Sequence, residues 1–173
     1  MSDDAPTEPM EPPARRAIPR LVLVCGLPGA GKTTLARRLE VALPAVRLCP
    51  DEWLAALRID LRDEATRDGL EAQFWRLAQR LLALGQSVIL ESGFWLRADR
   101  DEKRVGARLL GAAVELRYLH APLDELYRRI ERRNASPAPG DVIITRADLE
   151  LWTTFFQPPD DAELALFDPP TIL

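Results

Sequence analysis

Short apolar runs alternate with longer amphipathic segments along this chain from residue 20 onward. The apolar runs that fit buried strands are residues 21–25, 46–49, 87–91 and 114–119. The segments with apolar residues at helical spacing are residues 32–43, 63–84, 98–110, 123–133 and 145–156. Strands and helices that alternate in this order are typical of a parallel sheet with helices on both faces. The pattern therefore predicts one three-layer α/β domain with a mostly parallel central sheet.

Residues that favour helix ends support these bounds. Gly85 and Gly111 each follow a helical segment, where glycine relieves the strain of a left-handed C-cap. Thr145, with Asp148 three residues later, resembles a capping box. Between the last two long helices lies the break "NASPAPGD", so we expect a lid near residues 129–145.

The first 19 residues have a different composition. The segment "MSDDAPTEPMEPPARRAIP" is rich in proline and acidic residues and has few apolar side chains to offset the entropy of ordering. We expect a disordered tail over residues 1–19 and a folded domain over residues 20–173.

Net charge and hydropathy exclude some classes of protein. Lys and Arg number 23 against 27 Asp and Glu, and the net charge of -4 argues against a protein that coats nucleic acid. No apolar run approaches the roughly 20 residues that span a bilayer, and the N-terminus lacks a signal-peptide layout. We expect a cytoplasmic protein, monomeric or homodimeric, with Cys25 and Cys49 as buried free thiols and His120 in a structural role.

The stretch "GLPGAGKTTL" contains the strongest motif. Gly26, Gly31, Lys32 and Thr33 satisfy G-x-x-x-x-G-K-[ST], between a predicted strand and a predicted helix as the motif requires. Its glycines let backbone N–H groups approach phosphate oxygens at a helix N-terminus. Lys32 would reach the β- and γ-phosphates of ATP, and the Thr33 hydroxyl would hold Mg²⁺. The predicted nucleotide-binding residues are Gly26, Pro28, Gly29, Ala30, Gly31, Lys32, Thr33 and Thr34.

Two carboxylates follow strands that should end beside this loop. Open α/β sheets bind ligands at the carboxyl ends of their strands. Asp51, in "RLCPDEW", is predicted to orient an acceptor hydroxyl and accept its proton, and the alternative is an N-cap of the next helical turn. Glu91, in "SVILESGFW", is predicted to hold the magnesium shell, and the alternative is a partner for an arginine. Glu52 should point along its helical turn and is the weaker candidate base.

Arginines and aromatic residues complete the predicted site. Arg129 and Arg133 share one helix face leading into the lid, where guanidinium groups can stabilise a transferring phosphoryl group; the alternative is a solvated helix face. Arg97 and Arg100 follow Glu91 and are weaker candidates by the same argument. The aromatic residues that fit a wall for the acceptor, or alternatively core packing, are Trp53, Trp75, Phe94 and Trp95.

Taken in order, five motifs resemble a known family. They are "GLPGAGKTTLARRLE", "CPDEW", "VILESGFWLRADRDEKR", "ELRYLHAPLDELYRRIERRN" and "DLELWTTFFQPPDDAEL". The set resembles small bacterial AAA-type predicted kinases of the P-loop nucleoside-monophosphate-kinase type, a group that includes chloramphenicol phosphotransferase, zeta toxins and polynucleotide kinase domains. The resemblance implies a P-loop NTPase fold with about five parallel strands, ATP with Mg²⁺, an activating carboxylate at Asp51, lid residues Arg129 and Arg133, and a functional arginine at Arg100. Glu91 stands where this family usually has aspartate.

These observations favour an ATP-dependent phosphotransferase that moves the γ-phosphate to a hydroxyl of a small molecule. A nucleic-acid acceptor is disfavoured by the acidic net charge. Two alternatives remain open at this point. One is a nucleotide-binding ATPase switch without an acceptor, and the other is a zeta-toxin-like kinase.

Overall fold

The computed structural model describes residues 17–137 and 142–170. The disordered tail predicted for residues 1–19 lies outside the described residues except for residues 17–19, and the centre of the predicted lid lies outside them at residues 138–141.

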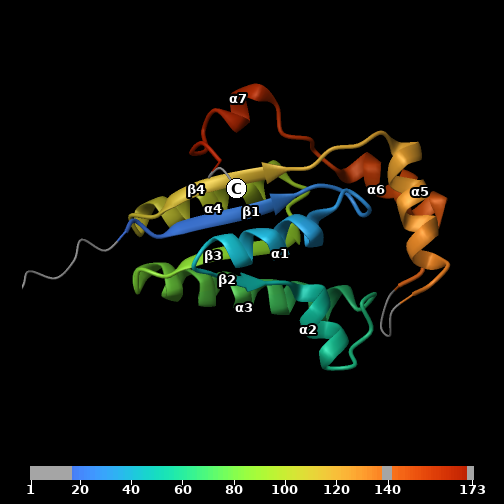
Figure 1. The fold of residues 1–173 in the computed structure, drawn as a ribbon, viewed down its shortest axis with the longest axis horizontal. Coiled ribbons are helices and arrows are strands. Elements are labelled where there is room, and N and C mark those ends of the chain that lie inside the picture. The colour runs from blue at the N-terminus through green and yellow to red at the C-terminus, as the bar shows by residue number, and fades with distance from the viewer. Residues whose placement is uncertain (1–16, 138–141, 171–173) are drawn as a thin grey trace, which may run out of the picture.

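A parallel four-stranded sheet forms the centre of the molecule (Figure 1). Its strands are β1 (Arg20–Cys25), β2 (Ala45–Leu48), β3 (Ser87–Gly93) and β4 (Ala113–Tyr118), in the order β2-β3-β1-β4. All three strand pairs are parallel. The four strand candidates of the sequence are therefore confirmed.

The sheet has four strands where about five were expected. After the last helix the chain returns to the free edge of β4, where the Asp168 N–H donates to the Val114 carbonyl at 2.8 Å. The Asp168 carboxylate accepts from the Val114 N–H at 2.6 Å. Pro169 and Pro170 follow at once and have no N–H to continue a ladder. A side chain thus takes the place of a strand partner, and the described residues form no fifth strand.

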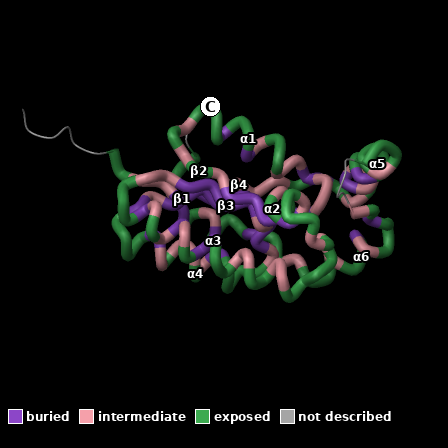
Figure 2. Tube along the Cα trace, turned by 90° about the horizontal axis from the view of Figure 1, so that it is seen from below, coloured by how far each residue is buried: buried purple, intermediate pink, exposed green. Residues whose placement is uncertain are grey.

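Helices cover both faces of the sheet. The helices of the described residues are α1 (Lys32–Ala42), α2 (Pro50–Ala56), α3 (Glu64–Ala83), α4 (Arg97–Leu109), α5 (Leu123–Asn134), α6 (Arg146–Phe155) and α7 (Asp161–Leu164). In Figure 2, α1 lies on one side of the buried sheet and α3 with α4 on the other, which confirms the three-layer prediction. The capping box predicted at Thr145 is present at the start of α6.

Apolar residues on the two sides of each strand build two cores. Val22, Val24 and Ile89 pack against α1, while alternate residues such as Leu23 and Leu90 pack against α3 and α4. A strand buried on both faces needs an almost continuous apolar sequence, which explains why the strand runs were so clear. Cys25 and Cys49 are buried free thiols as predicted. Among the described residues, none of the helices has both the length and the hydropathy that crossing a membrane requires.

A buried ion pair fixes the C-terminal segment to α4. Arg100 and Glu163 are both almost fully buried, and their side chains meet at 2.6 and 2.8 Å in a two-pronged pair. The same guanidinium donates to the carbonyls of Phe94 at 2.8 Å and Trp95 at 3.2 Å. The resemblance implied a functional arginine at this position. The structure instead buries the Arg100 guanidinium against Glu163 and does not bring it to the nucleotide site. It gives this residue a structural role.

Removing one partner of this pair should destabilise the fold. Glu163→Leu leaves the Arg100 guanidinium buried without its counter-charge, and we expect the free energy of unfolding to fall by about 3–5 kcal/mol in urea denaturation. The double variant Arg100→Met with Glu163→Leu should recover most of this loss, because no charge is then left buried. A loss below about 1 kcal/mol for the single variant, the level of an exposed pair, would contradict this account.

Candidate functional site

The carboxyl ends of β1 and β3 meet at one edge of the sheet. The backbone N–H of Gly26, just after β1, donates to the carbonyl of Gly93, the last residue of β3, at 3.1 Å. These strands are neighbours, yet α1 follows β1 on one face and α4 follows β3 on the other (Figure 2). Open α/β sheets bind ligands at such a switch point. In Figure 1, α2, α5 and α6 also lie at this end of the strands.

The loop from β1 to α1 has the backbone that a phosphate cradle needs. Gly26, Gly29 and Gly31 have φ values of 146°, 81° and 97°, which other residues rarely adopt. Space is restricted as well, because a Cβ at Gly26 would lie 2.5 Å from the Leu119 carbonyl oxygen and one at Gly29 would lie 2.8 Å from that of Leu126. Gly31 is the N-cap of α1 and provides no side-chain cap, so N–H groups of the first turn remain available to an anion.

Lys32 lies over its own loop. Its ammonium donates to the Leu27 carbonyl at 3.1 Å. Burial lowers the pKa of the Lys32 ammonium, and the negative charges of Asp51 and Glu91 oppose that shift. The lysine is thus a partly desolvated cation beside the loop. A phosphate group there would supply a counter-charge, and burial would strengthen its attraction to the ammonium.

Glu91 joins the end of β3 to the start of α1. One of its carboxylate oxygens accepts from the Thr33 hydroxyl at 2.5 Å, and the other lies 2.9 Å from the Arg47 guanidinium. The arginine partner of the alternative interpretation is thus present, and Glu91 also lies beside the P-loop threonine, so its magnesium role stays a prediction. A hydroxyl and a carboxylate oxygen in this arrangement suit Mg²⁺, which prefers one or two such ligands completed by water and phosphate oxygens. Among the described residues, no group of three or more acidic, His or Cys side chains is placed to hold a metal by itself.

Arg47 is a site residue that sequence reasoning missed. The Arg47 side chain, which pairs with Glu91, is only 9% exposed. The same guanidinium also pairs with Glu52 at 2.5 Å and with Glu40 at 3.0 Å. The pairing of β2 with β3 is what would have revealed it. Arg47 is paired with Ile89, and Glu91 lies two residues further along β3 on the same face of the sheet.

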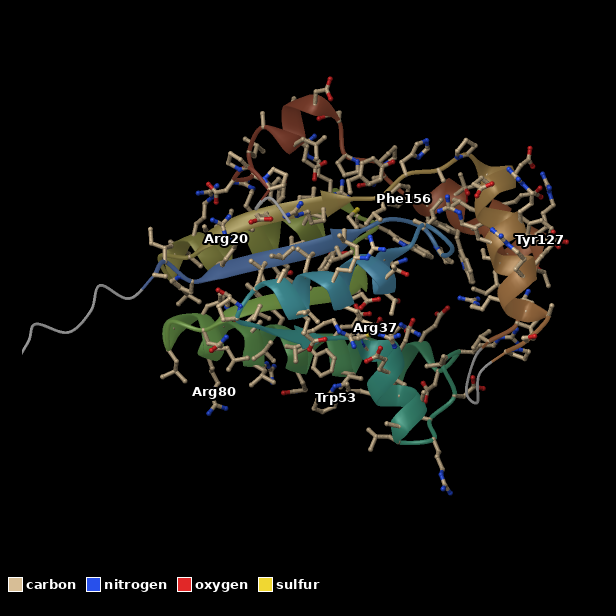
Figure 3. The ribbon with its side chains drawn as sticks, in the orientation of Figure 1. Arg20, Arg37, Trp53, Arg80, Tyr127 and Phe156 are labelled. Carbon is tan, nitrogen blue, oxygen red and sulfur yellow. The ribbon has the colours of Figure 1, made fainter. Side chains whose placement is uncertain are left out.

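Glu52 is held by arginines from two elements. Besides Arg47, it pairs with Arg37 of α1 at 2.8 Å, and Figure 3 shows Arg37 between α1 and α2. The side-chain hydrogen bonds from these guanidinium groups oppose the effect of partial burial and lower the pKa of Glu52. Glu52 is therefore an ionised structural residue, as expected of the weaker candidate base.

Asp51 lies in the first turn of α2, just after the carboxyl end of β2. The N-cap of α2 is Cys49, so the alternative in which Asp51 caps that helix is wrong. Its carboxylate is 62% exposed and pairs with Arg67 of α3 at 2.6 Å. The charge of Asp51 acts on Lys32. The structure thus brings the predicted acceptor-activating carboxylate to the phosphate side of the sheet, with an arginine that the sequence did not reveal.

Helices α5 and α6 stand over the phosphate loop. Leu27 and Ala30 of the loop pack with Ile130 of α5 and Leu149 of α6 in one apolar cluster. Arg129 is paired with Glu125 at 2.8 Å, and its guanidinium also donates to the Gly29 carbonyl at 3.4 Å.

The second lid arginine reaches in another direction. The Arg133 guanidinium donates to the Val142 carbonyl, on the far side of the lid break, at 3.4 Å. The structure therefore brings Arg129 to the loop and leaves Arg133 exposed on the lid itself.

A cavity of about 430 Å³ opens beside β3. Its lining residues come from α3, the end of β3 and α4, and they are Asp68, Glu71, Ala72, Phe74, Trp75, Leu90, Ser92, Phe94, Trp95, Leu96, Asp99 and Lys103. Three of the four predicted wall aromatics are among them. The fourth, Trp53, packs edge-on against Phe74 with ring centroids 5.0 Å apart and is labelled in Figure 3. Two of its lining residues, Ser92 and Phe94, flank Gly93, whose carbonyl accepts from the Gly26 N–H of the phosphate loop.

Carboxylates of this cavity were not predicted from the sequence. Burial raises the pKa of Glu71 from 4.5 to about 7; the charge of Arg67 opposes this, and the charges of Asp68, Asp51 and Asp99 add to it. Glu71 therefore keeps its proton to a higher pH than an exposed glutamate does.

Replacing Glu71 should stabilise the protein at alkaline pH. The raised pKa means that the folded state holds a proton that the unfolded state has lost, so stability falls as pH rises from 4.5 to about 7. Glu71→Gln removes this loss, and we expect its melting temperature at pH 8 to exceed that of the natural chain by about 2–4 °C for each kcal/mol recovered. The gain should shrink towards pH 5. Glu64→Gln, an exposed change on the same helix, is the control, and an equal or lower melting temperature for Glu71→Gln at pH 8 would contradict the account.

Comparison with protein families agrees with this architecture. The AAA_33 family, described as an AAA domain, matches residues 21–159. The match covers most of the chain, so the chain belongs to this P-loop kinase-like family. A comparison with curated proteins finds no match.

Solved structures share the fold. A chain of the Pnkp1/Rnl/Hen1 RNA repair complex is 22% identical with a TM-score of 0.66, and the alignment covers 87% of this chain but only 47% of that one. Kti12 from Chaetomium thermophilum, solved with ADP-AlF3, is 17% identical with a TM-score of 0.63 and 82% coverage of both chains. A gluconokinase from Sinorhizobium meliloti 1021 is 18% identical with a TM-score of 0.53 and coverage of 84% and 79%. At these identities the likeness shows a P-loop NTPase fold, and the fold prediction is confirmed.

Proposed function

We propose that this protein is an ATP-dependent phosphotransferase that moves the γ-phosphate of ATP to a hydroxyl of a small molecule bound in the cavity. One observation carries the proposal. Asp51 lies in the first turn of α2, just after β2, and pairs at 2.6 Å with Arg67 of α3, the helix that supplies Asp68 and Glu71 to the cavity lining. A carboxylate that lies near both a phosphate cradle and a pocket is where a base for phosphoryl transfer should lie.

In this reaction the loop glycines and Lys32 would hold the triphosphate through N–H groups and an ammonium. Thr33 and Glu91 would hold Mg²⁺, which neutralises charge on the phosphate oxygens when bound. The acceptor hydroxyl would lie against Asp51. As the acceptor oxygen bonds to the γ-phosphorus, the bond from that phosphorus to the β,γ-bridging oxygen breaks, ADP leaves, and Asp51 takes the hydroxyl proton.

The lid arginines would complete the site. The Arg129 guanidinium lies 3.4 Å from the Gly29 carbonyl of the phosphate loop, and from there it would contact the transferring group. Arg133 would need closure of the lid. A lid that closes only over bound acceptor would also exclude water and suppress hydrolysis of ATP.

A small molecule is a better acceptor than the end of a nucleic acid. The names of the structural neighbours include both a gluconokinase and an RNA repair complex, so the fold alone does not decide. The chain has a net charge of -4, and the cavity is lined by three carboxylates and one lysine. These charges would repel a polyanion.

An ATPase switch is the second candidate, and the Asp51–Arg67 pair favours it. In that function the carboxylate would hold α2 against α3 and would take no part in the chemistry. ADP release would then be slow and indifferent to any added alcohol.

Neutralising Asp51 separates the two functions. With ATP, Mg²⁺ and pooled aminoglycosides, phenicols, nucleosides or sugars, we expect one pool to raise ADP release and Asp51→Asn to reduce that rise by about 10²–10⁴-fold. ATP affinity should stay within about twofold, because the phosphate loop is intact, and Glu64→Gln should behave as the natural chain.

Arg67→Gln tests the switch explanation. It breaks the same ion pair but keeps the Asp51 carboxylate. If both variants lower the melting temperature alike and leave the same slow ADP release in every pool, Asp51 is a structural residue and the phosphotransferase proposal fails.

A further inference from the structure

The charges of the cavity are unbalanced. Asp68 and Glu71 of α3 and Asp99 of α4 line it, against the single ammonium of Lys103. That ammonium already pairs with Glu102 at 2.8 Å and lies 5.2 Å from the centroid of the Trp75 ring. The ammonium of Lys103 is therefore already in contact with Glu102 and the Trp75 ring, and it forms no ion pair with Asp68, Glu71 or Asp99.

Most carboxylates near the nucleotide side of the site are held by arginines, as Glu52 and Glu91 are. Asp68, Glu71 and Asp99 differ, because in the described part of the chain none of them has an ion-pair or hydrogen-bond partner. Glu71 is also partly desolvated, which penalises its charged form in the empty cavity. A positively charged occupant would remove this penalty.

The dimensions and walls of the cavity fit an organic cation better than a metal ion. Its carboxylates are not clustered closely enough for three to share one ion, within the residues that the structure describes. The volume of about 430 Å³ is within the range of small-molecule pockets. Trp75, Phe94 and Trp95 supply aromatic surface, which attracts ammonium groups as well as apolar carbon.

We propose that the acceptor is an amino alcohol: a molecule that presents a hydroxyl to Asp51 and one or more ammonium groups to the carboxylates of the cavity. Glu71 and Asp99 are the specificity-determining residues, one from each helix that lines the pocket. The same charges select against anionic acceptors, since a carboxylate or phosphate in this cavity would meet three like charges. This inference rests on the proposed function for the transfer step, but its binding part can be tested alone.

Binding is measured without nucleotide through the tryptophan fluorescence of the full chain, because Trp75 and Trp95 line the cavity. Two pairs of probes differ in charge and little else: choline with 3,3-dimethyl-1-butanol, and kanamycin with its fully N-acetylated form. Gluconate serves as an anionic polyol. We expect the charged member of at least one pair to bind about tenfold or more tightly than its neutral partner, with gluconate weakest. Saturable binding by neither cation, or equal binding within both pairs, overturns the proposal.

Variants connect that preference to the named residues. Asp99→Asn and Glu71→Gln should each lower cation affinity by about five- to tenfold and leave the neutral probes unaffected. Glu64→Gln removes a charge from α3 outside the cavity and is the matched control. An equal loss for the control would mean that only the overall charge matters, which overturns the assignment.

The pH dependence provides a second readout. Choline keeps its charge at all pH values, so its affinity should rise between pH 6 and 8 as Glu71 loses its proton at about pH 7. The other charged groups around Glu71 are Arg67, Asp68, Asp51 and Asp99, with Lys103 on the opposite helix. Because the rise is assigned to the Glu71 carboxylate, Glu71→Gln should abolish it. A rise that survives in Glu71→Gln contradicts the role of this residue.

Turnover then distinguishes this inference from the proposed function. If a neutral or anionic alcohol raises ADP release in an Asp51-dependent way and the cations do not, the phosphotransferase proposal stands and the amino-alcohol inference fails. If the cations bind through Glu71 and Asp99 but no alcohol raises ADP release, the binding site stands and the transfer function fails.

Discussion

Glu91 joins the elements on which the site depends. Its carboxylate accepts a hydrogen bond from the Thr33 hydroxyl and forms an ion pair with Arg47. Thr33 belongs to α1, Glu91 to β3 and Arg47 to β2, so one nearly buried carboxylate fixes three elements that are far apart in sequence. A buried carboxylate is costly unless its oxygens are satisfied, and here each oxygen has a partner. The position of the phosphate loop relative to the rest of the sheet follows from this arrangement, together with the Gly26–Gly93 backbone bond.

On this frame the site divides into two regions of opposite character. The phosphate side presents backbone N–H groups, Lys32 and the arginines of the lid, which suit a triphosphate. The cavity side presents aromatic rings and three carboxylates that form no ion pair within residues 17–137 and 142–170. Asp51 follows β2 at the carboxyl end of the sheet and pairs with Arg67 of α3, the helix that also lines the cavity, and the proposed chemistry depends on this position. A site with this polarity would hold a polyanion at one end and a cation at the other, which limits how an acceptor can enter.

Features encoded by neighbouring residues could be predicted from the sequence. Contacts between side chains of distant elements could not. The strands were evident because both faces are buried, and the phosphate loop was evident because its conformation depends on glycines within six residues of one another. Asp51 and Glu91 were found because carboxyl ends of parallel strands must meet at one edge. Arg47 and Glu71 were missed since their roles depend on which side chains from other elements face them.

The structure differs from two expectations taken from the family resemblance. In both cases the cause is a contact or a residue that lies outside the motifs. Arg100 lies in the matching stretch of sequence, but Glu163, 63 residues away, turns its guanidinium into the core. A fifth strand was implied, yet the prolines after Asp168 end the pairing with β4 after a single contact. The chain can therefore belong to the family while differing from its pattern at the C-terminal edge.

The most direct test of the central claim is phosphorus NMR of the products. The natural chain is incubated with ATP, Mg²⁺ and the acceptor pools, and the fate of the γ-phosphate is followed alongside ADP. The account predicts a phosphomonoester signal that grows in step with ADP in one pool. Inorganic phosphate as the sole product, formed at the same rate whether or not any acceptor is present, would contradict it.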